Sequence, residues 1–72
     1  HDCIVDDFAH IAPGVNLAGG VHVGQGSLMG IGSCSIPNTQ IGNWVTIGAG
    51  ATVINDIPDG STAIGTPARP IR

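Results

Sequence analysis

Val21-His22-Val23-Gly24-Gln25-Gly26 and Ser27-Leu28-Met29-Gly30-Ile31-Gly32 are two consecutive units of a six-residue repeat that extends through most of the chain. In each unit the third residue is Val or Met, and a glycine follows it. Steps of six in both directions reach nine such positions, of which eight hold an aliphatic residue or Met: Val5, Ile11, Leu17, Val23, Met29, Ser35, Ile41, Ile47 and Val53. A period of six fits neither an amphipathic helix nor a half-buried strand, but it fits a solenoid with short faces and tight corners.

Three hexads form one triangular coil, so the chain of 72 residues holds about four coils. Each face is then a short parallel strand that pairs with the same face of the next coil, about 4.8 Å away. The fifth hexad position, counted so that the aliphatic residue is first, is small or β-branched throughout and also points inward. We therefore predict an all-β, single-domain parallel β-helix over residues 1–72. Because the chain begins inside the repeat, we expect it to be the C-terminal part of a longer protein.

Two stretches depart from the repeat. Ser35 occupies an aliphatic position, so either Ile36 takes its place in the core or Ser35 bonds a neighbouring backbone group. Pro37-Asn38 predicts a corner beside it. Residues 55–60, Asn-Asp-Ile-Pro-Asp-Gly, predict a loop before the last segment.

The composition excludes several functions. The net charge is −3, there is no Lys, and the only basic residues are Arg69 and Arg72, so no basic surface for a nucleic-acid backbone exists. No run of about 18 apolar residues is present for a membrane span. Cys3 and Cys34 lie in different phases of the hexad, which argues against a disulfide. Reduced thiols are typical of a cytoplasmic protein.

The residues resemble those of the hexapeptide-repeat acyltransferases, most closely the sialic-acid O-acetyltransferase and UDP-amino-sugar N-acetyltransferase type. The segments that carry this resemblance are His1-Asp2-Cys3-Ile4, His10, Ala18-Gly19, the stretch 33–38 and Gly65-Thr66-Pro67-Ala68-Arg69. The resemblance implies a left-handed β-helix, homotrimers with sites at subunit boundaries, and acetyl-CoA as co-substrate. It also implies a separate N-terminal α/β domain that binds the sugar nucleotide and is absent from residues 1–72.

His1 is the candidate general base for acyl transfer to an amine or hydroxyl of a sugar or sugar nucleotide. Histidine suits this role because its ordinary pKa lies near neutrality. Gly19 lies three hexads after His1, so we expect it beside His1 on the next coil, where its N–H could reach a substrate. The resemblance assigns general-base catalysis to His1, its assistance to Asp2 and the oxyanion donor to Gly19.

The resemblance also assigns acetyl-CoA contacts to His10, Ile31 and Ala49. Successive steps of three hexads join Pro13, Ile31, Ala49 and Pro67, and they predict one column of corner residues along which a pantetheine arm could lie. A loop after Val53 would move Pro67 out of that column. Arg69 and Arg72 are the cations available for the nucleotide phosphates of the cofactor.

Two other functions remain open from the residues alone. A zinc carbonic anhydrase on the same fold needs three converging histidines, and the spacings of His1, His10 and His22 do not match the His-x4-His pattern of that group. A non-catalytic trimeric scaffold is the other alternative. His22 has no assigned role and is expected at the surface. Trp44 either belongs to a subunit or cofactor contact or is an isolated exposed aromatic residue.

Overall fold

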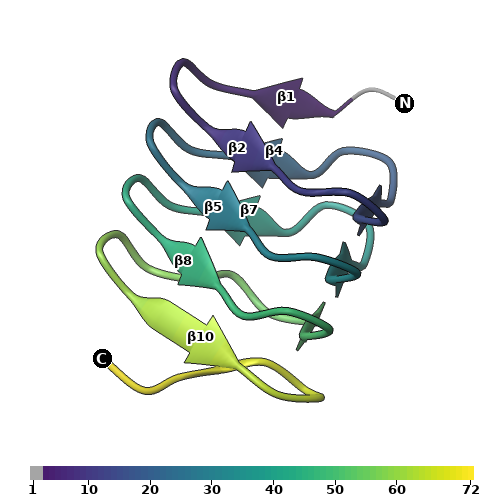
Figure 1. Ribbon diagram of the computed structural model, residues 1–72. Coiled ribbons are helices and arrows are strands. Elements are labelled where there is room, and N and C mark those ends of the chain that lie inside the picture. Colours follow the sequence, from purple (N-terminus) through teal and green to yellow (C-terminus); the bar gives the residue numbers. More distant parts are fainter. Residues whose placement is uncertain (1–2) are drawn as a thin grey trace.

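The computed structural model describes residues 3–72, which form a triangular stack of coils with three faces (Figure 1). Face BC contains β1 (Ile4–Val5), β4 (His22–Val23) and β7 (Gln40–Ile41). Face CA contains β2 (His10–Ile11), β5 (Leu28–Met29), β8 (Thr46–Ile47), β10 (Thr62–Ile64) and β11 (Arg69–Pro70). Face AB contains β3 (Asn16–Leu17), β6 (Cys34–Ser35) and β9 (Thr52–Val53). The predicted all-β solenoid is confirmed.

The three corners are called A, B and C, and each face is named for the two corners that it connects. Corner A joins face CA to face AB and contains Pro13-Gly14, Ile31-Gly32 and Ala49-Gly50. Corner B joins face AB to face BC and contains Gly19-Gly20 and Pro37-Asn38. Corner C joins face BC to face CA and contains Asp7-Phe8, Gln25-Gly26, Asn43-Trp44 and Asp59-Gly60.

Strand pairing is parallel and follows the predicted spacing of three hexads through the first three coils. His22 pairs with both Ile4 and Gln40, and Leu28 pairs with both His10 and Thr46. The repeat positions Val23, Met29 and Ile47 point inward and are at most 1% exposed. The hydrophobic core is therefore a column of aliphatic side chains along the axis of the stack.

Each corner is a tight turn whose third residue has a positive φ. In the turn Gly24–Ser27, the Ser27 N–H donates to the Gly24 carbonyl at 3.3 Å, and Gly26 has φ 69°. Glycine adopts this left-handed conformation without the steric cost that a side chain brings. Asn38, Phe8 and Trp44 occupy the equivalent positions at other corners, with φ between 57° and 63°.

Gly24 is required for a different reason, because neighbouring coils approach closely there. A Cβ atom at Gly24 would lie 2.5 Å from the Gly42 carbonyl carbon, and that backbone is fixed by the ladder. We expect Gly24→Ala to lower the free energy of unfolding by about 3 kcal/mol, the upper range for overpacking. Thermal denaturation followed by circular dichroism measures this change.

Gly32→Asn is the matched control for that prediction. Gly32 has no atom within 4 Å of an added Cβ, and asparagine already adopts this turn conformation at Asn38. Its expected effect is below about 1 kcal/mol. Equal losses in both variants would show that close packing of the coils is not what Gly24 provides.

Ser35 keeps the core position, and the register does not shift. Ser35 is 4% exposed and pairs with both Leu17 and Val53, whereas Ile36 is 42% exposed. The Ser35 hydroxyl bonds the Thr39 hydroxyl, and Thr39 Oγ1 donates to the Ile36 carbonyl at 3.0 Å. The register shift of the first alternative is therefore wrong. Ser35 is hydrogen-bonded in the core, but its partner is the Thr39 hydroxyl and not the backbone group that the second alternative named.

The last coil is two residues shorter than the others. Thr46 pairs with Thr62 and Ile41 bridges to Ile57, and both pairs are closer in sequence than three full hexads. Gly65 therefore follows Ala49 at corner A, and the predicted place of Pro67 in that column is wrong. Pro67 instead lies in the turn of an antiparallel hairpin between β10 and β11, which closes the C-terminal end of the stack.

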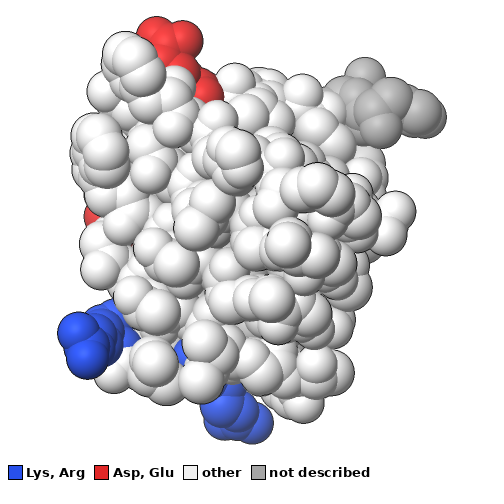
Figure 2. Space-filling model, in the orientation of Figure 1, with Lys and Arg blue, Asp and Glu red and all other residues white. Residues whose placement is uncertain are grey.

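Cys34 is a free thiol, and the Cys3 Sγ atom donates to the Ala18 carbonyl at 3.2 Å. Residues 3–72 contain no helix, so none of them belongs to a candidate membrane-spanning helix. Arg69 and Arg72 project at the C-terminal end of the stack, while carboxylates appear over the first coil (Figure 2).

Candidate active site

The predicted site residues fall on two corners and two strands. Gly19 lies at corner B, and Ile31 and Ala49 lie at corner A; all three are exposed. His10 is exposed on β2 of face CA, just before corner A. His1 and Asp2 lie outside the described residues. Ile4 pairs with His22, and the sequence spacing of that pair equals the spacing between His1 and Gly19.

Except at Pro13 and Pro37, which have no N–H, the second residue of a corner turn has an N–H that takes no part in the backbone ladder. At corner C, side-chain oxygens of the next coil accept from these groups: Gln25 N donates to Asn43 Oδ1 at 2.9 Å. Asn43 N donates in the same way to Asp59 Oδ1 at 2.8 Å. The N–H group at this turn position is therefore available at the surface to donate a hydrogen bond to an oxygen atom.

Gly19, Ile31 and Ala49 occupy this same second position of their turns. The residue that follows each in the next coil has no side-chain oxygen: Pro37 follows Gly19, Ala49 follows Ile31, and Gly65 follows Ala49. Corner A thus presents two stacked backbone donors, the N–H groups of Ile31 and Ala49, that the next coil does not cap. An extended ligand with carbonyl groups, or an oxyanion, fits such donors.

Corners A and B stand at opposite edges of face AB. Each corner keeps its place from coil to coil (Figure 1). Gly19 and the Ile31–Ala49 column lie at different corners, so in one chain they face different directions. The sequence predicted both sets, but the triangular cross-section separates them. A ligand that contacts both sets must therefore cross face AB or lie between two copies of the chain.

Face AB carries exposed aliphatic side chains next to corner B. Ile36 and Ile54 are 42% and 41% exposed and stack in register, because Ile36 N donates to the Val53 carbonyl at 3.0 Å. Cys34 is half-buried at the centre of the face and donates to Thr52 Oγ1 at 3.6 Å. None of the described residues on this face is charged.

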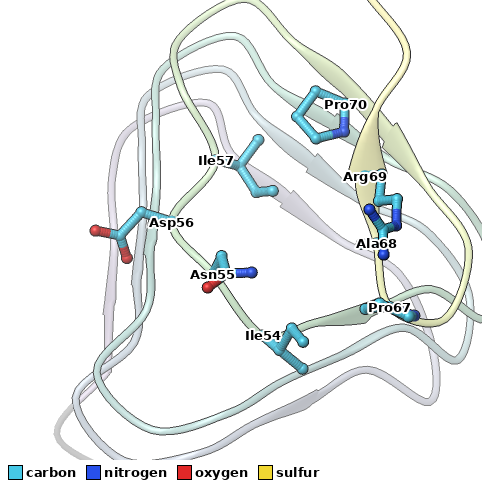
Figure 3. Close-up of a pocket in the computed structure, with 8 residues that line it drawn as sticks. All are labelled: Ile54, Asn55, Asp56, Ile57, Pro67, Ala68, Arg69 and Pro70. Atoms are coloured by element: carbon cyan, nitrogen blue, oxygen red, sulfur yellow. The ribbon is translucent and has the colours of Figure 1, made fainter.

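Arg69 does not join the corner A column directly. It lies on β11, paired with Ile64, and lines a hollow of about 440 Å³ at the C-terminal end of the stack (Figure 3). Figure 3 shows Ile57 pointing into this hollow and the Asp56 carboxylate pointing away from it. The Asp56 Oδ1 atom instead accepts the Gln40 N–H at 2.8 Å.

His22 has a partner that the sequence did not reveal. Its Nε2 atom lies 2.8 Å from Asp6 Oδ2, and both side chains are about two-fifths exposed, at 37% and 40%. The pair joins neighbouring coils diagonally across face BC. His10 lies on face CA, away from His22, and residues 3–72 contain no group of three potential metal ligands. The described histidines do not converge in one chain.

No protein-family model matches the chain. The acetyltransferase domain of PglB from Neisseria gonorrhoeae is 49% identical over 99% of the chain and superposes with a TM-score of 0.97. A variant of GDP-perosamine N-acetyltransferase from Caulobacter crescentus, solved with CoA and GDP-perosamine, is 41% identical over 99% of the chain, with the same TM-score of 0.97. A mitochondrial serine acetyltransferase from Arabidopsis thaliana is 47% identical over 47 residues, or 65% of the chain.

The chain spans 35% and 34% of the two solved structures and 12% of the plant enzyme. The gonococcal domain is also known in complex with acetyl coenzyme A. These similarities confirm the left-handed parallel β-helix that the sequence resemblance implied. The chain belongs to the hexapeptide-repeat acyltransferases, as a part of their β-helix.

Proposed function

We propose that the protein is an acetyl-CoA-dependent acyltransferase that acetylates an amine or hydroxyl of a sugar or sugar nucleotide. The observation that carries this proposal is the column of uncapped backbone donors at Ile31 and Ala49, with a third such donor at Gly19. The pantetheine arm of acetyl-CoA contains amide carbonyls at intervals, which suit a column of donors. Similar structures that hold acetyl-CoA, or CoA and GDP-perosamine, support the choice of ligands.

The proposed reaction is a direct attack of the acceptor on the thioester. His1, assisted by Asp2, takes the proton from the acceptor as its nitrogen or oxygen bonds to the acetyl carbon. The Gly19 N–H stabilises the negative charge on the thioester oxygen. The carbon–sulfur bond then breaks, and CoA leaves with a proton returned from His1. His10 contacts the cofactor near the thioester, and Arg69 contacts its nucleotide phosphates.

We propose a homotrimer in which face AB of each copy faces the other two. This arrangement brings corner B of one copy against corner A of the next, and the two sets of site residues then meet around one cofactor. The exposed Ile36 and Ile54 side chains on this face support the choice. The acceptor-binding residues belong to a separate α/β domain that precedes residue 1, which agrees with relatives about three times as long as the chain.

The proposal is tested by measuring CoA binding and acetyl transfer with the full-length protein. Calorimetry with CoA is expected to give a saturable isotherm that Ala49→Trp abolishes, because the larger side chain covers the donors at corner A. Mass spectrometry after incubation with acetyl-CoA and an amino-sugar nucleotide is expected to find the acetylated sugar. A folded protein that binds no CoA at millimolar concentration would overturn the proposal and leave the scaffold alternative.

A further inference from the structure

The peptide bond between Ala18 and Gly19 carries the N–H group that the proposed function assigns to the oxyanion. Its carbonyl oxygen accepts two hydrogen bonds, from the Val21 N–H at 3.4 Å and from the Cys3 Sγ atom at 3.2 Å. The Cys3 Sγ atom also lies 3.8 Å from the Leu17 carbonyl oxygen, but a thiol has one hydrogen and the Ala18 oxygen is nearer. The thiol therefore lies behind the peptide bond whose N–H is the proposed oxyanion donor.

The orientation of this N–H follows from the planarity of the peptide bond. The bond between Ala18 and Gly19 is trans, so its C=O and N–H point in opposite directions. Because the Ala18 carbonyl points toward Val21 and Cys3, the Gly19 N–H points away from both. The following peptide bond is also held, since the Gly19 carbonyl accepts the Asn38 N–H at 3.0 Å. Gly19 is therefore fixed from both sides.

Corner C contains the same arrangement with a negatively charged oxygen bound to it. The Ser27 hydroxyl donates to the Gly42 carbonyl at 2.6 Å, so a side-chain donor again lies behind a peptide bond. The N–H of that peptide bond belongs to Asn43, and it donates to the Asp59 carboxylate at 2.8 Å. This carboxylate oxygen is the counterpart of the oxyanion at Gly19. The fold thus already binds one anionic oxygen in this way.

A third example lies at corner A. The Ser33 hydroxyl donates to the Gly30 carbonyl at 2.7 Å, beside the turn bond from the Ser33 N–H at 3.1 Å. The N–H of the same peptide bond belongs to Ile31, one of the two stacked donors proposed for the cofactor. Ala51 occupies the corresponding position behind Ala49 and has no polar side chain. Two of the three N–H groups in the proposed function therefore have a side-chain donor on the carbonyl of their own peptide bond.

We propose that Cys3 is a positioning residue for acetyl transfer: its thiol holds and polarises the peptide bond of Ala18, so that the Gly19 N–H is a stronger donor to the oxyanion. This inference rests on the proposed function, which assigns the oxyanion to Gly19. A hydrogen bond accepted by an amide carbonyl strengthens the bond that the same amide donates by about 10–30%. Since an oxyanion donor is worth about 10²–10³ in kcat, the thiol should contribute about two- to eightfold.

The first measurement needs no catalysis and uses the full-length, ¹⁵N-labelled protein. Cys3→Ala is expected to move the ¹H and ¹⁵N resonances of the Gly19 amide, because they respond to the hydrogen bond at the carbonyl of their own peptide bond. Cys3→Ser keeps a donor and should leave them closer to the parent. Ser33→Ala is the matched control, which should move the Ile31 amide instead. Gly19 resonances that do not move in Cys3→Ala, or that move equally in Cys3→Ser, would overturn the proposal.

Steady-state kinetics measures the role in turnover. Cys3→Ala should lower kcat about two- to eightfold, and Cys3→Ser should restore most of the loss. The KM for acetyl-CoA should not change, because the oxyanion forms only in the transition state. Cys3 is only half-buried, so the alanine variant is expected to fold, which thermal denaturation checks. A kcat in Cys3→Ala equal to that of an active parent would refute the role of Cys3 and leave the proposed function in place.

A double-mutant cycle with Gly19→Pro shows whether Cys3 acts through this N–H. Proline lacks the N–H and fits the turn, since Pro13 and Pro37 hold the same position of their turns. In the Gly19→Pro background, Cys3→Ala should cause no further loss of kcat. The same loss in both backgrounds would show that Cys3 acts elsewhere. A parent that transfers no acetyl group would overturn the proposed function, and the role of Cys3 with it.

Discussion

Replacing His1 with alanine is expected to lower kcat for acetyl transfer at least about 10²-fold, the usual contribution of a general base. The KM for acetyl-CoA should change little, because the proposed cofactor contacts lie at His10, Ile31 and Ala49 instead. Steady-state kinetics with the full-length protein, with CoA release followed by mass spectrometry, provides both parameters. The loss should be confined to turnover, which separates chemistry from binding.

His22→Ala is the matched control for this result. His22 is a histidine on face BC that pairs with Asp6 and takes no part in the proposed reaction. Its removal should leave kcat within about twofold of the parent, since an exposed side-chain pair of this kind contributes little to stability. A rate that His1→Ala leaves unchanged would favour the scaffold function and remove His1 from the mechanism.

A double substitution on face AB, Ile36→Asp with Ile54→Asp, is expected to separate the trimer into monomers. Two carboxylates would have to be buried without partners in the contact, which costs far more than the lost apolar burial. Acetyl transfer should fall at least about 10²-fold, because corner B of one copy no longer meets corner A of the next. Analytical ultracentrifugation gives the mass, and the same samples give the rate.

Ile4→Asp is the control for the assembly state. Ile4 is 58% exposed on face BC, so it is more exposed than either isoleucine of face AB. The proposed trimer leaves face BC outside the contact, and this variant should keep the trimeric mass. A double variant of face AB that remains trimeric and active would show that another face joins the subunits.

The sequence predicted the features that the repeat controls. Eight aliphatic positions and the small residues between them determine a coil of three hexads, and the stacking of His22 on Ile4 and Gln40 follows from that length. The same spacing of three hexads places Ile31 and Ala49 in one column. A repeat of this kind sets long-range contacts from local spacing, since each coil packs on its neighbour.

The sequence could not predict the features that depart from the regular spacing of three hexads per coil. The last coil is two residues short, and nothing in the stretch 55–60 shows whether it forms a loop outside the coil or shortens the coil itself. The repeat alone therefore puts Pro67 in a column that Gly65 occupies. The diagonal pair His22–Asp6 also escapes prediction, because its separation in sequence is not a multiple of the hexad.

The conformation of Trp44 could likewise not be predicted from the sequence. Its hexad position is visible there, but its positive φ and its packing on Gly26 depend on the geometry of two neighbouring coils. The separation of Gly19 from the Ile31–Ala49 column also needs the three corners, because a linear repeat shows only which residues stack. The residues that stack in the first three coils were predictable, and the direction in which each stack faces became known from the fold.

The most direct test of a site shared between two copies uses mixed oligomers of two inactive variants. His1→Ala lacks the base at one corner, and Ala49→Trp blocks the cofactor column at another. Because each proposed site takes its base from one copy and its cofactor column from the next, random mixing should restore about a quarter of the sites to full function. Acetyl transfer near that level in the co-refolded mixture, with neither parent active, is the predicted result. A mixture no more active than its parents would contradict the account.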